Sequence, residues 1–323
     1  MTILVDVQKE QLNKMNLLDS CLGKRVLVTG ATGFIGQHLC DALIDLGADV
    51  FALSRSASPS NFSEKVKTQA VDLRHLKSTL RVIRMIRPEI IFHLAGLVNT
   101  RQELNLVIPT LTNNLSASIN LFLALAEVSC DRVVVTGSSE EPDVSRFGSS
   151  PNSPYSAAKE ALTGYSRMFH KVFSLPIVVA RPYMTYGPRQ HNKKIIPYTI
   201  TSLLRGISPQ ISSGRRICDL IYIQDLIMAL LLTGFKPGLS GEVVDLGTGI
   251  GTTIFDAVRI IGEILQTAHT PVFGAIPDRL YEYPQIADIA NTYDLIGFRP
   301  NWSLREGLEL TINWYYSQIK NPG

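Results

Sequence analysis

The chain has 323 residues, 45% of them hydrophobic, and a formal net charge of +3. This length allows a sizeable core in one large domain or in two closely joined domains. The sequence carries no block of like charge and no uninterrupted apolar stretch of membrane-spanning length, so we expect neither nucleic acid nor a membrane as a partner.

The cysteines and the first residues bear on the cellular compartment. The four cysteines are scattered without metal-ligand spacing, so we expect free thiols, no metal and a reducing cytoplasm: Cys21, Cys40, Cys130 and Cys218. Residues 1–23 contain charged side chains where a secretory signal would be apolar, and we interpret them as an N-terminal extension.

A strand, a glycine-rich turn and a helix are predicted next. The run at 26–29 is apolar and short enough for one buried strand, and apolar residues repeat at helical spacing over 35–46. Between them, Gly30 permits a tight turn, Gly33 lets the backbone approach a pyrophosphate, and Gly36 lets the helix pack closely on the strand. Because a helix N-terminus also attracts anions, this arrangement predicts a dinucleotide site.

The end of the next strand, at 49–53, indicates which dinucleotide binds. An acidic residue there would accept a hydrogen bond from the ribose 2′-hydroxyl of NAD, whereas an arginine accommodates the 2′-phosphate of NADP. The chain has Ser54 and Arg55 at this point and no carboxylate. We therefore predict NADP, with NAD as the alternative; Arg55 as an ordinary surface arginine is the competing interpretation.

Two further strand ends are expected at the cofactor site. Asp72 ends a short run, where it would either accept a hydrogen bond from the adenine amine or cap the helix predicted over 73–86. The strand at 89–94 leads into Ala95 and Gly96, whose small size lets the backbone lie close to a ligand. We interpret His93 in this strand as a packed core histidine.

The middle of the chain continues to alternate strands and helices. A strongly apolar helix is predicted over 115–128, and its width suggests a second contact surface. A strand at 133–135 leads to Ser138, Ser139, Glu140 and Glu141, and a long helix follows over 154–173. The alternation predicts a doubly wound parallel sheet of Rossmann type.

Tyr155 and Lys159 lie four positions apart and share a helix face. A tyrosine near its ordinary pKa of about 10 is a poor acid or base at pH 7. A neighbouring ammonium would lower the pKa of the phenol, and a serine hydroxyl would hold the substrate oxygen in reach. Tyr155 would then exchange a proton with a carbinol or carbonyl oxygen, while a nicotinamide exchanges hydride with the attached carbon.

From residue 181 onward the pattern changes to an aromatic, proline-interrupted loop, followed by a cluster of cations suited to a second diphosphate: Lys193, Lys194, Arg205, Arg215 and Arg216. We expect three parts in all. They are the extension at 1–23, a cofactor-binding Rossmann domain at 24–180, and a smaller α/β substrate-binding region at 181–323, with about 217–248 returning to the Rossmann domain.

The chain resembles the extended short-chain dehydrogenase/reductases, the nucleotide-sugar epimerase, dehydratase and ketoreductase family. The resemblance runs from about residue 24 to 316 and is carried by the motifs at 29–36, 92–96, 153–159, 181–188, 219–225 and 287–289. It implies Ser139, Tyr155 and Lys159 as the catalytic group, with Glu141 where dehydratases keep an acid and Glu140 as a further catalytic candidate beside it.

The resemblance also implies binding residues and an assembly. Cofactor binding is expected at Gly30, Thr32, Gly33, Phe34, Ile35, Gly36, Ser54, Arg55, Asp72, Leu73, Leu94, Ala95, Gly96, Asn114, Tyr155, Lys159 and Arg181. Asn114 supports the environment of the lysine. The nucleotide-sugar substrate is expected at Ser138, Tyr186, Arg189, Lys194 and Arg216. The helices near 115–128 and 154–173 look like the family's homodimer interface.

Three departures from the family pattern matter. The interval from Ser139 to Tyr155 is sixteen residues, shorter than usual, which leaves Ser138 as the alternative serine. Met184 stands where an asparagine is usual. Cys218 stands in place of the common arginine before Asp219, and Arg216 is a substitute for that arginine.

The motifs at 137–141 and 247–252 most resemble reductases of nucleotide-linked 4-keto-6-deoxysugars. We therefore expect an NADP-dependent reductase with Tyr155 as the proton donor. The alternative is a 4-epimerase or 4,6-dehydratase that recycles its own nicotinamide. A dehydratase would need a carboxylate pair, for which Glu140 and Glu141 are the candidates. A non-catalytic NADP-binding scaffold is the third interpretation.

Overall fold

The computed structural model describes residues 17–55, 62–142 and 149–320. The chain forms two compact units. Unit 1 consists of Met1–Pro182, Ile227–Asp245 and Asn291–Phe298, and unit 2 consists of Tyr183–Leu226, Leu246–Ala290 and Arg299–Gly323. Whereas one return to the cofactor domain was expected, at about 217–248, the chain returns twice.

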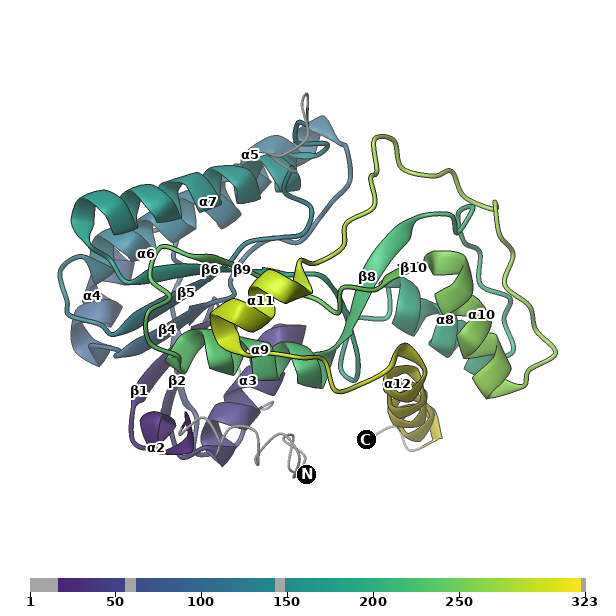
Figure 1. The fold of residues 1–323 in the computed structure, drawn as a ribbon, viewed down its shortest axis with the longest axis horizontal. Coiled ribbons are helices and arrows are strands. Elements are labelled where there is room, and N and C mark those ends of the chain that lie inside the picture. Colours follow the sequence, from purple (N-terminus) through teal and green to yellow (C-terminus); the bar gives the residue numbers. More distant parts are fainter. Residues whose placement is uncertain (1–16, 56–61, 143–148, 321–323) are drawn as a thin grey trace. The chain divides into compact units, whose positions relative to one another are not determined.

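Unit 1 is built on a parallel sheet (Figure 1). Within the described residues its strands are β1 (Arg25–Thr29), β2 (Asp49–Ser54), β3 (Lys67–Ala70), β4 (Ile90–His93), β5 (Arg132–Thr136), β6 (Ile177–Pro182) and β9 (Val243–Leu246). Their order in the sheet is β3-β2-β1-β4-β5-β6-β9, and neighbouring strands from β3 to β6 pair in parallel. The order reverses next to β1, which brings the ends of β1 and β4 together.

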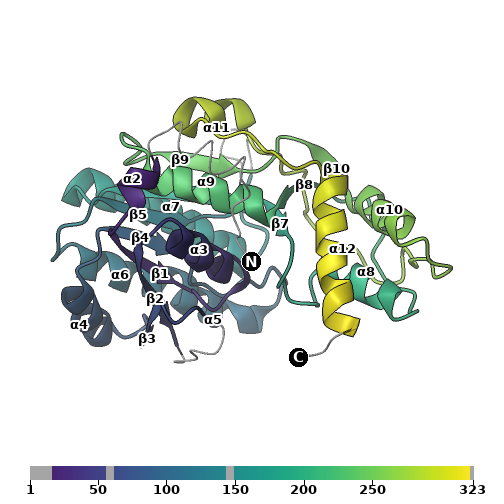
Figure 2. The ribbon, with the colours of Figure 1, turned by 90° about the horizontal axis from the view of Figure 1, so that it is seen from below.

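Helices cover both faces of this sheet. They are α2 (Leu17–Cys21), α3 (Phe34–Asp45), α4 (Leu76–Ile86), α5 (Val107–Thr110), α6 (Ala117–Leu125), α7 (Pro154–Phe173), α9 (Ile223–Phe235) and α11 (Ile289–Ile296). Figures 1 and 2 show α4, α6 and α7 on one face and α3 with α9 on the other. This confirms the predicted doubly wound Rossmann-type fold.

Apolar strand residues and helix faces form the core of unit 1. Val133 and Val135 in β5 pack with Phe122 of α6 and Phe169 of α7, whose rings meet edge to face at a centroid distance of 5.2 Å. His93 is buried among them, with its ring nitrogens 2.7 Å from the hydroxyls of Thr29 and Ser118. Burial lowers its pKa to about 3, so it is a neutral core histidine, as predicted.

Two predicted helices have different bounds. The helix expected over 115–128 is part of a longer helical run that starts with a 3₁₀ turn, Leu104–Leu106, and passes through a π-helical segment, Leu111–Ser116. The helix expected over 73–86 begins at Leu76 with His75 as its N-cap. Asp72 therefore does not cap it, which rules out that alternative.

Unit 2 is a small α/β assembly around a three-stranded sheet of order β10-β8-β7. Its strands are β7 (Met184–Tyr186), β8 (Ile217–Tyr222) and β10 (Gly251–Thr253), and its helices are α8 (Ile195–Leu204), α10 (Ile254–Leu265) and α12 (Leu304–Lys320). The three helices pack on one another. Asp219 in β8 organises the neighbouring loops by accepting hydrogen bonds from the backbone N–H groups of Thr248, Gly249 and Ala287.

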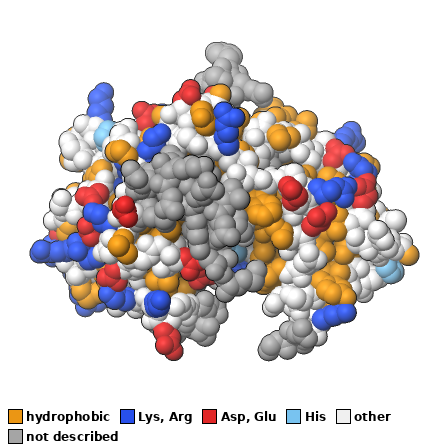
Figure 3. Space-filling view, turned by 60° about the horizontal axis from the view of Figure 1, so that its bottom comes forward, with side chains coloured by type: hydrophobic (Ala, Val, Ile, Leu, Met, Phe, Trp, Pro, Cys, Tyr) orange, Lys and Arg blue, Asp and Glu red, His pale blue; other side chains and the backbone are white. Residues whose placement is uncertain are grey.

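The surface is mixed in charge. On the face shown in Figure 3, Lys and Arg side chains alternate with Asp and Glu side chains. The helical run Leu104–Leu125 is long and apolar enough to cross a membrane by length and composition alone. Helices of soluble proteins pass the same test, so this is weak evidence for a membrane span.

Candidate active site

The turn between β1 and α3 forms the predicted cradle. Gly30 has φ +68°, and a Cβ there would lie 2.7 Å from the backbone nitrogen of Ala95. A Cβ at Gly36 would collide with the carbonyl oxygen of Gly30. Gly33 is the N-cap of α3 and supplies no side-chain cap, which leaves the helix start open to an anion. These residues fit a pyrophosphate.

The residues next to the glycines complete the cradle. The carbonyl oxygen of Thr32 accepts a hydrogen bond of 2.8 Å from the Gln37 amide, which fixes the turn. Phe34 and Ile35 open α3, and both are half-buried. Leu94 continues from β4, and its N–H donates to the carbonyl oxygen of Thr29 at 3.2 Å. Backbone contacts thus hold the cradle in shape.

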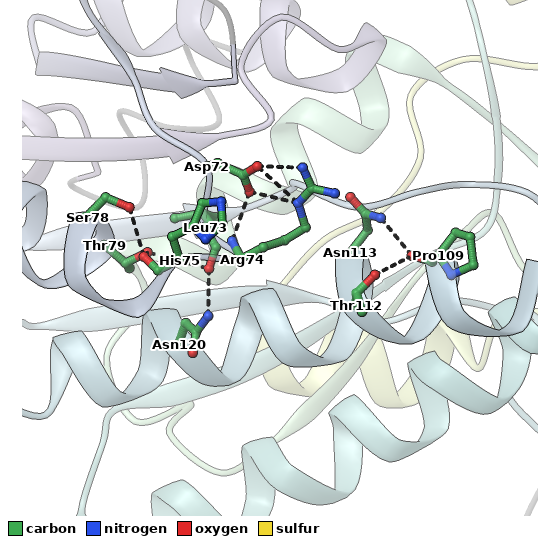
Figure 4. A network of polar contacts seen from close by, with 10 residues as sticks. All are labelled: Asp72, Leu73, Arg74, His75, Ser78, Thr79, Pro109, Thr112, Asn113 and Asn120. Carbon is green, nitrogen blue, oxygen red and sulfur yellow. Dashed lines mark hydrogen bonds and ion pairs between the residues drawn. The ribbon is translucent and has the colours of Figure 1, made fainter.

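The carboxyl end of β2, at the far end of the predicted cofactor site, has no acid. Ser54 is the last residue of β2, and Arg55 follows it with an exposed side chain. Asp72 lies beyond β3 and is bound to Arg74: the Arg74 N–H and guanidinium donate to it at 2.6–3.0 Å (Figure 4). This pairing lowers the pKa of Asp72 to about 2, so the carboxylate stays an acceptor. The Leu73 carbonyl accepts from the Asn120 amide.

The end of β4 meets the π-helical segment. The Asn114 side chain is buried and bonds both backbone groups of Leu97, accepting from its N–H at 2.6 Å and donating to its carbonyl at 3.1 Å. A Cβ at Gly96 would lie 2.9 Å from the Asn114 amide oxygen, so glycine is needed there. Asn114 thus fixes the loop at Ala95 and Gly96.

Tyr155, Lys159 and Ser138 are brought together, all three buried. Tyr155 and Lys159 are on α7, and the Lys159 ammonium lies 5.8 Å from the centre of the Tyr155 ring. Lys159 donates to the carbonyl oxygen of Thr136 at 2.6 Å, at the end of β5. The Ser138 hydroxyl acts on the Tyr155 phenol and favours its ionised form, which lowers the pKa of the phenol.

Ser138 is the one of the two candidate serines that acts on the pKa of Tyr155. The Ser139 backbone N–H donates to the Pro182 carbonyl oxygen at 3.4 Å. Sequence spacing alone left both serines open, and this arrangement favours Ser138, the alternative serine, as the partner of the tyrosine.

Burial dominates the protonation of this group. It raises the pKa of Tyr155 to about 12, against the hydrogen bond from Ser138, which lowers it. It also lowers the pKa of Lys159 to about 8. The expected lowering of the Tyr155 pKa by Lys159 is not found. Burial destabilises the phenolate more than the neighbouring Ser138 hydroxyl stabilises it.

The two glutamates differ in their surroundings. Glu141 is buried, and it accepts from the Ser138 N–H and from the Thr163 hydroxyl, each at 2.7 Å. Glu140 is half-buried, and its charge acts on Tyr155 by raising the pKa of the phenol. Both oxygens of Glu141 are thus engaged within the fold.

Arg181 pairs with Asp245, its Nε lying 2.8 Å from a carboxylate oxygen. The two residues join the ends of β6 and β9. The Arg181 side chain also packs beside Gly137, where a Cβ would lie 2.8 Å from the Arg181 Cγ. Arg181 therefore borders the serine turn more closely than it borders the glycine cradle.

The expected substrate residues lie on unit 2. Tyr186 is buried; its hydroxyl donates to the Leu304 carbonyl at 3.3 Å, so it supports the fold of the unit and does not present a free side chain. Arg189 is exposed at φ +66°, and Lys194 is exposed at the N-cap of α8. Arg216 pairs with Glu282 at 3.1 Å.

Several residues of the site were missed from the sequence. Thr136 and Thr163 hold Lys159 and Glu141, Asp245 holds Arg181, and Glu282 binds both Arg216 and Arg279. Thr163 had a readable signal, because it follows Lys159 by one helical turn on the same face of α7. The others depend on which strand ends and loops meet.

Comparisons with known proteins agree with this geometry. The model of the NAD dependent epimerase/dehydratase family matches residues 26–247. The UDP-glucose 4-epimerase of Mycolicibacterium smegmatis is 27% identical, over 90% of this chain and 98% of the relative. A dTDP-glucose 4,6-dehydratase of Actinoplanes sp. is 26% identical, over 90% of this chain and 97% of the relative.

Solved structures give the same result. The UDP-glucuronic acid 4-epimerase of Bacillus cereus, in complex with UDP-glucuronic acid and NAD, matches with a TM-score of 0.81 and 25% identity. The match covers 91% of this chain and 99% of that chain. Family model, relatives and fold coincide on the segments that carry the glycine cradle and the tyrosine–lysine pair. The chain belongs to the NAD dependent epimerase/dehydratase family of enzymes.

Proposed function

We propose that the chain is a nucleotide-sugar 4-epimerase that oxidises and then re-reduces its substrate without net consumption of a cofactor. The observation that supports this proposal best is the buried group of Ser138, Tyr155 and Lys159. Glu141 lies beside this group, and both of its carboxylate oxygens accept hydrogen bonds from within the fold. This supports one proton-transfer group and not the carboxylate pair that elimination of water requires. The relatives support a redox-neutral reaction over the net reduction expected from the sequence.

Each protein group has a defined part in this reaction. A nicotinamide held in the cradle would supply the acceptor for the C4 hydride and would give that hydride back to the opposite face of the 4-ketone, which inverts C4. Tyr155 takes the proton of the 4-hydroxyl and later returns it, and Ser138 holds that oxygen and relays the proton. Lys159, with a pKa of about 8, is mostly protonated at pH 7 and supplies positive charge next to the phenol. The glycine cradle and the open start of α3 hold the pyrophosphate.

Product analysis tests this function. Purified protein is incubated with UDP-, GDP- and dTDP-hexoses and a catalytic amount of nicotinamide cofactor, and products are identified by NMR and mass spectrometry. We expect a 4-epimer of unchanged mass and no net change in cofactor absorbance. Stoichiometric oxidation of NADPH by a 4-ketosugar would instead establish the reductase.

A 4,6-dehydratase is the second candidate, because Glu140 acts on Tyr155 and is half-buried at the same turn. This reaction removes a proton from C5 and expels water from C6, and Glu140 would have to serve both steps. Loss of water from the product, with solvent deuterium at C5 in D₂O, would establish it. An epimer without deuterium at carbon excludes it.

For the cofactor we propose NADP, because of the residues at the carboxyl end of β2. Ser54 and Arg55 stand where an NAD enzyme places a carboxylate, while the solved relative binds NAD. A guanidinium bond to the 2′-phosphate is worth roughly 1.5–3 kcal/mol, or about tenfold to a hundredfold in affinity. We expect Arg55→Ala to weaken NADP by that factor and to leave NAD unchanged. We expect Ser54→Asp to shift preference to NAD.

Calorimetric titration of both cofactors into both variants is the measurement. Arg87→Ala is the matched control, because Arg87 ends α4 and lies away from the β2 end. Equal binding of NAD and NADP by the unmodified protein would show that Arg55 is an ordinary surface arginine.

We also propose a homodimer through the helical run 104–125 and α7. The helical run 104–125 packs beside α7, and the two leave large apolar side chains exposed: Leu104, Val107, Ile108, Leu111, Leu123, Tyr165, Val172 and Phe173. An apolar surface of this extent on neighbouring helices is typical of an interface.

A further inference from the structure

The carboxylate of Glu141 links the serine turn to α7. Glu141 is 6% exposed. Its Oε1 accepts the backbone N–H of Ser138, and its Oε2 accepts the hydroxyl of Thr163, each at 2.7 Å. The Glu141 N–H in turn donates to the Ser138 carbonyl at 3.1 Å. Ser138 is thus bound to Glu141 through both of its backbone groups.

The partners of Glu141 lie where they can control the catalytic pair. Thr163 follows Tyr155 by eight residues and Lys159 by four, so all three side chains point from the same face of α7. Glu141 therefore joins the residue that bears the serine hydroxyl to the helix that bears the phenol. A change in this link alters the distance between the two hydroxyls.

The surroundings are shaped for a carboxylate. A Cβ at Gly137 would lie 2.6 Å from the Glu141 Oε1, so glycine leaves the space that the side chain occupies. The positive charges of Lys159 and Arg181 both favour the ionised carboxylate, against the effect of burial. Burying a charged group is costly, and an apolar residue of similar size is often as stabilising. A merely space-filling role would not need a side chain that accepts hydrogen bonds here.

We propose that Glu141 is a positioning residue, which holds the Ser138 hydroxyl against the Tyr155 phenol by tying the serine turn to Thr163. It acts through Ser138 and does not itself exchange protons with the sugar. This inference rests on the proposed roles of Ser138 and Tyr155, and it holds for any reaction of the family that uses that pair.

A double-mutant cycle tests the proposal on whichever nucleotide sugar the chain turns over. Glu141→Leu is expected to lower kcat about a hundredfold, the scale of a misplacement of about 1 Å in an active site. In the background of Ser138→Ala, the same change is expected to cost less than about twofold. Glu141→Gln retains an acceptor for the Ser138 N–H and is expected to keep most of kcat. Glu160→Gln, on the exposed side of α7, is the matched control and should leave kcat unchanged.

Each outcome decides the proposal. Equal losses from Glu141→Leu with and without Ser138 would overturn it, since Glu141 would then act independently of the serine. A Gln variant as inactive as Leu would also overturn it and would indicate proton transfer by the carboxylate. Products of a dehydratase or reductase would refute the proposed epimerase but not this inference. The double-mutant cycle measures the coupling between Glu141 and Ser138, which does not depend on which product forms.

A second measurement needs no substrate. Hydrogen exchange of the peptide covering 136–142 is expected to be faster in Glu141→Leu, because the Ser138 N–H loses its acceptor. Cofactor affinity and circular dichroism should match the unmodified protein. Unchanged protection of this peptide would show that Glu141 does not hold the turn.

Discussion

A buried lysine is the clearest single-residue feature of the unit 1 site. Lys159 donates a hydrogen bond to the Thr136 carbonyl, and burial lowers its pKa from an ordinary 10.5 to about 8. The folded protein therefore releases the Lys159 proton at a lower pH than the unfolded chain does. Such a residue is retained for its chemistry and at the expense of stability.

The pH dependence of the free energy of unfolding should reveal the lowered pKa of Lys159. Between pH 8 and pH 10.5 the unfolded chain keeps a proton on Lys159 that the folded chain has released, so the free energy of unfolding rises with pH. Relative to Lys159→Met, the unmodified protein should gain up to about 3 kcal/mol across this window. Urea denaturation of both proteins at several pH values measures it.

Comparison with the variant cancels the other groups that titrate in this range. If the two stability curves run parallel from pH 7 to pH 10.5, the lysine is not buried in the charged form. Lys159→Met should also lose nearly all turnover, because the phenol loses its neighbouring charge.

At this scale the sequence predicted types of residue better than individual contacts. Tyr155 and Lys159 followed from helical spacing and a preceding glycine motif. The choice between Ser138 and Ser139 could not, because it depends on how the turn after β5 folds against α7. Glu140 and Glu141 looked alike in sequence, and only Thr163 on a distant segment distinguishes them.

The β1 turn and α3 act as one element because the glycines are sites of close approach. Gly36→Ala would place a methyl group against the carbonyl oxygen of Gly30. We expect a loss of about 1–3 kcal/mol in the free energy of unfolding, typical of overpacking, and weaker binding of either cofactor. Thermal denaturation and calorimetry measure the two effects.

Gly262→Ala is the matched control. Gly262 lies in α10, and a Cβ there meets nothing within 4 Å. Alanine should stabilise that helix by about 0.5–1 kcal/mol and leave cofactor binding unchanged. If Gly36→Ala stabilises the protein and leaves cofactor binding unchanged, as expected for Gly262→Ala, then the inferred need for close packing at Gly36 is wrong.

Elements with strong periodicity were predicted well, as the helix at 154–173 and the strand–glycine–helix start show. The π-helical segment Leu111–Ser116 was not predicted. Its cause is tertiary: Asn114 bonds Leu97, and Ser118 donates to the Asn114 carbonyl while it contacts His93. No local pattern encodes an extra residue in a helix when distant partners hold it there.

For the whole molecule, the exposed apolar helices predict assembly. Ile108 is 64% exposed on α5, and a charged residue there would be buried without a partner in the proposed dimer. We expect Ile108→Arg to weaken dimerisation at least about thirtyfold, as substitution at an interface hot spot does. Sedimentation velocity over a concentration series is the measurement.

Ile207→Arg is a fair control, because Ile207 is 56% exposed and lies on unit 2. It should leave the dimer intact. A monomeric unmodified protein at micromolar concentration would refute the proposed interface.

The division of the chain into units has a consequence for engineering new specificities. The backbone crosses between the units five times, after residues 182, 226, 245, 290 and 298. A chimera that joined the first half of this chain to the second half of a relative would give unit 1 a foreign β9 and a foreign α9. If unit 2 sets substrate specificity, as we propose, that specificity should be transplanted as three separate grafts, 183–226, 246–290 and 299–323, each cut at a crossing.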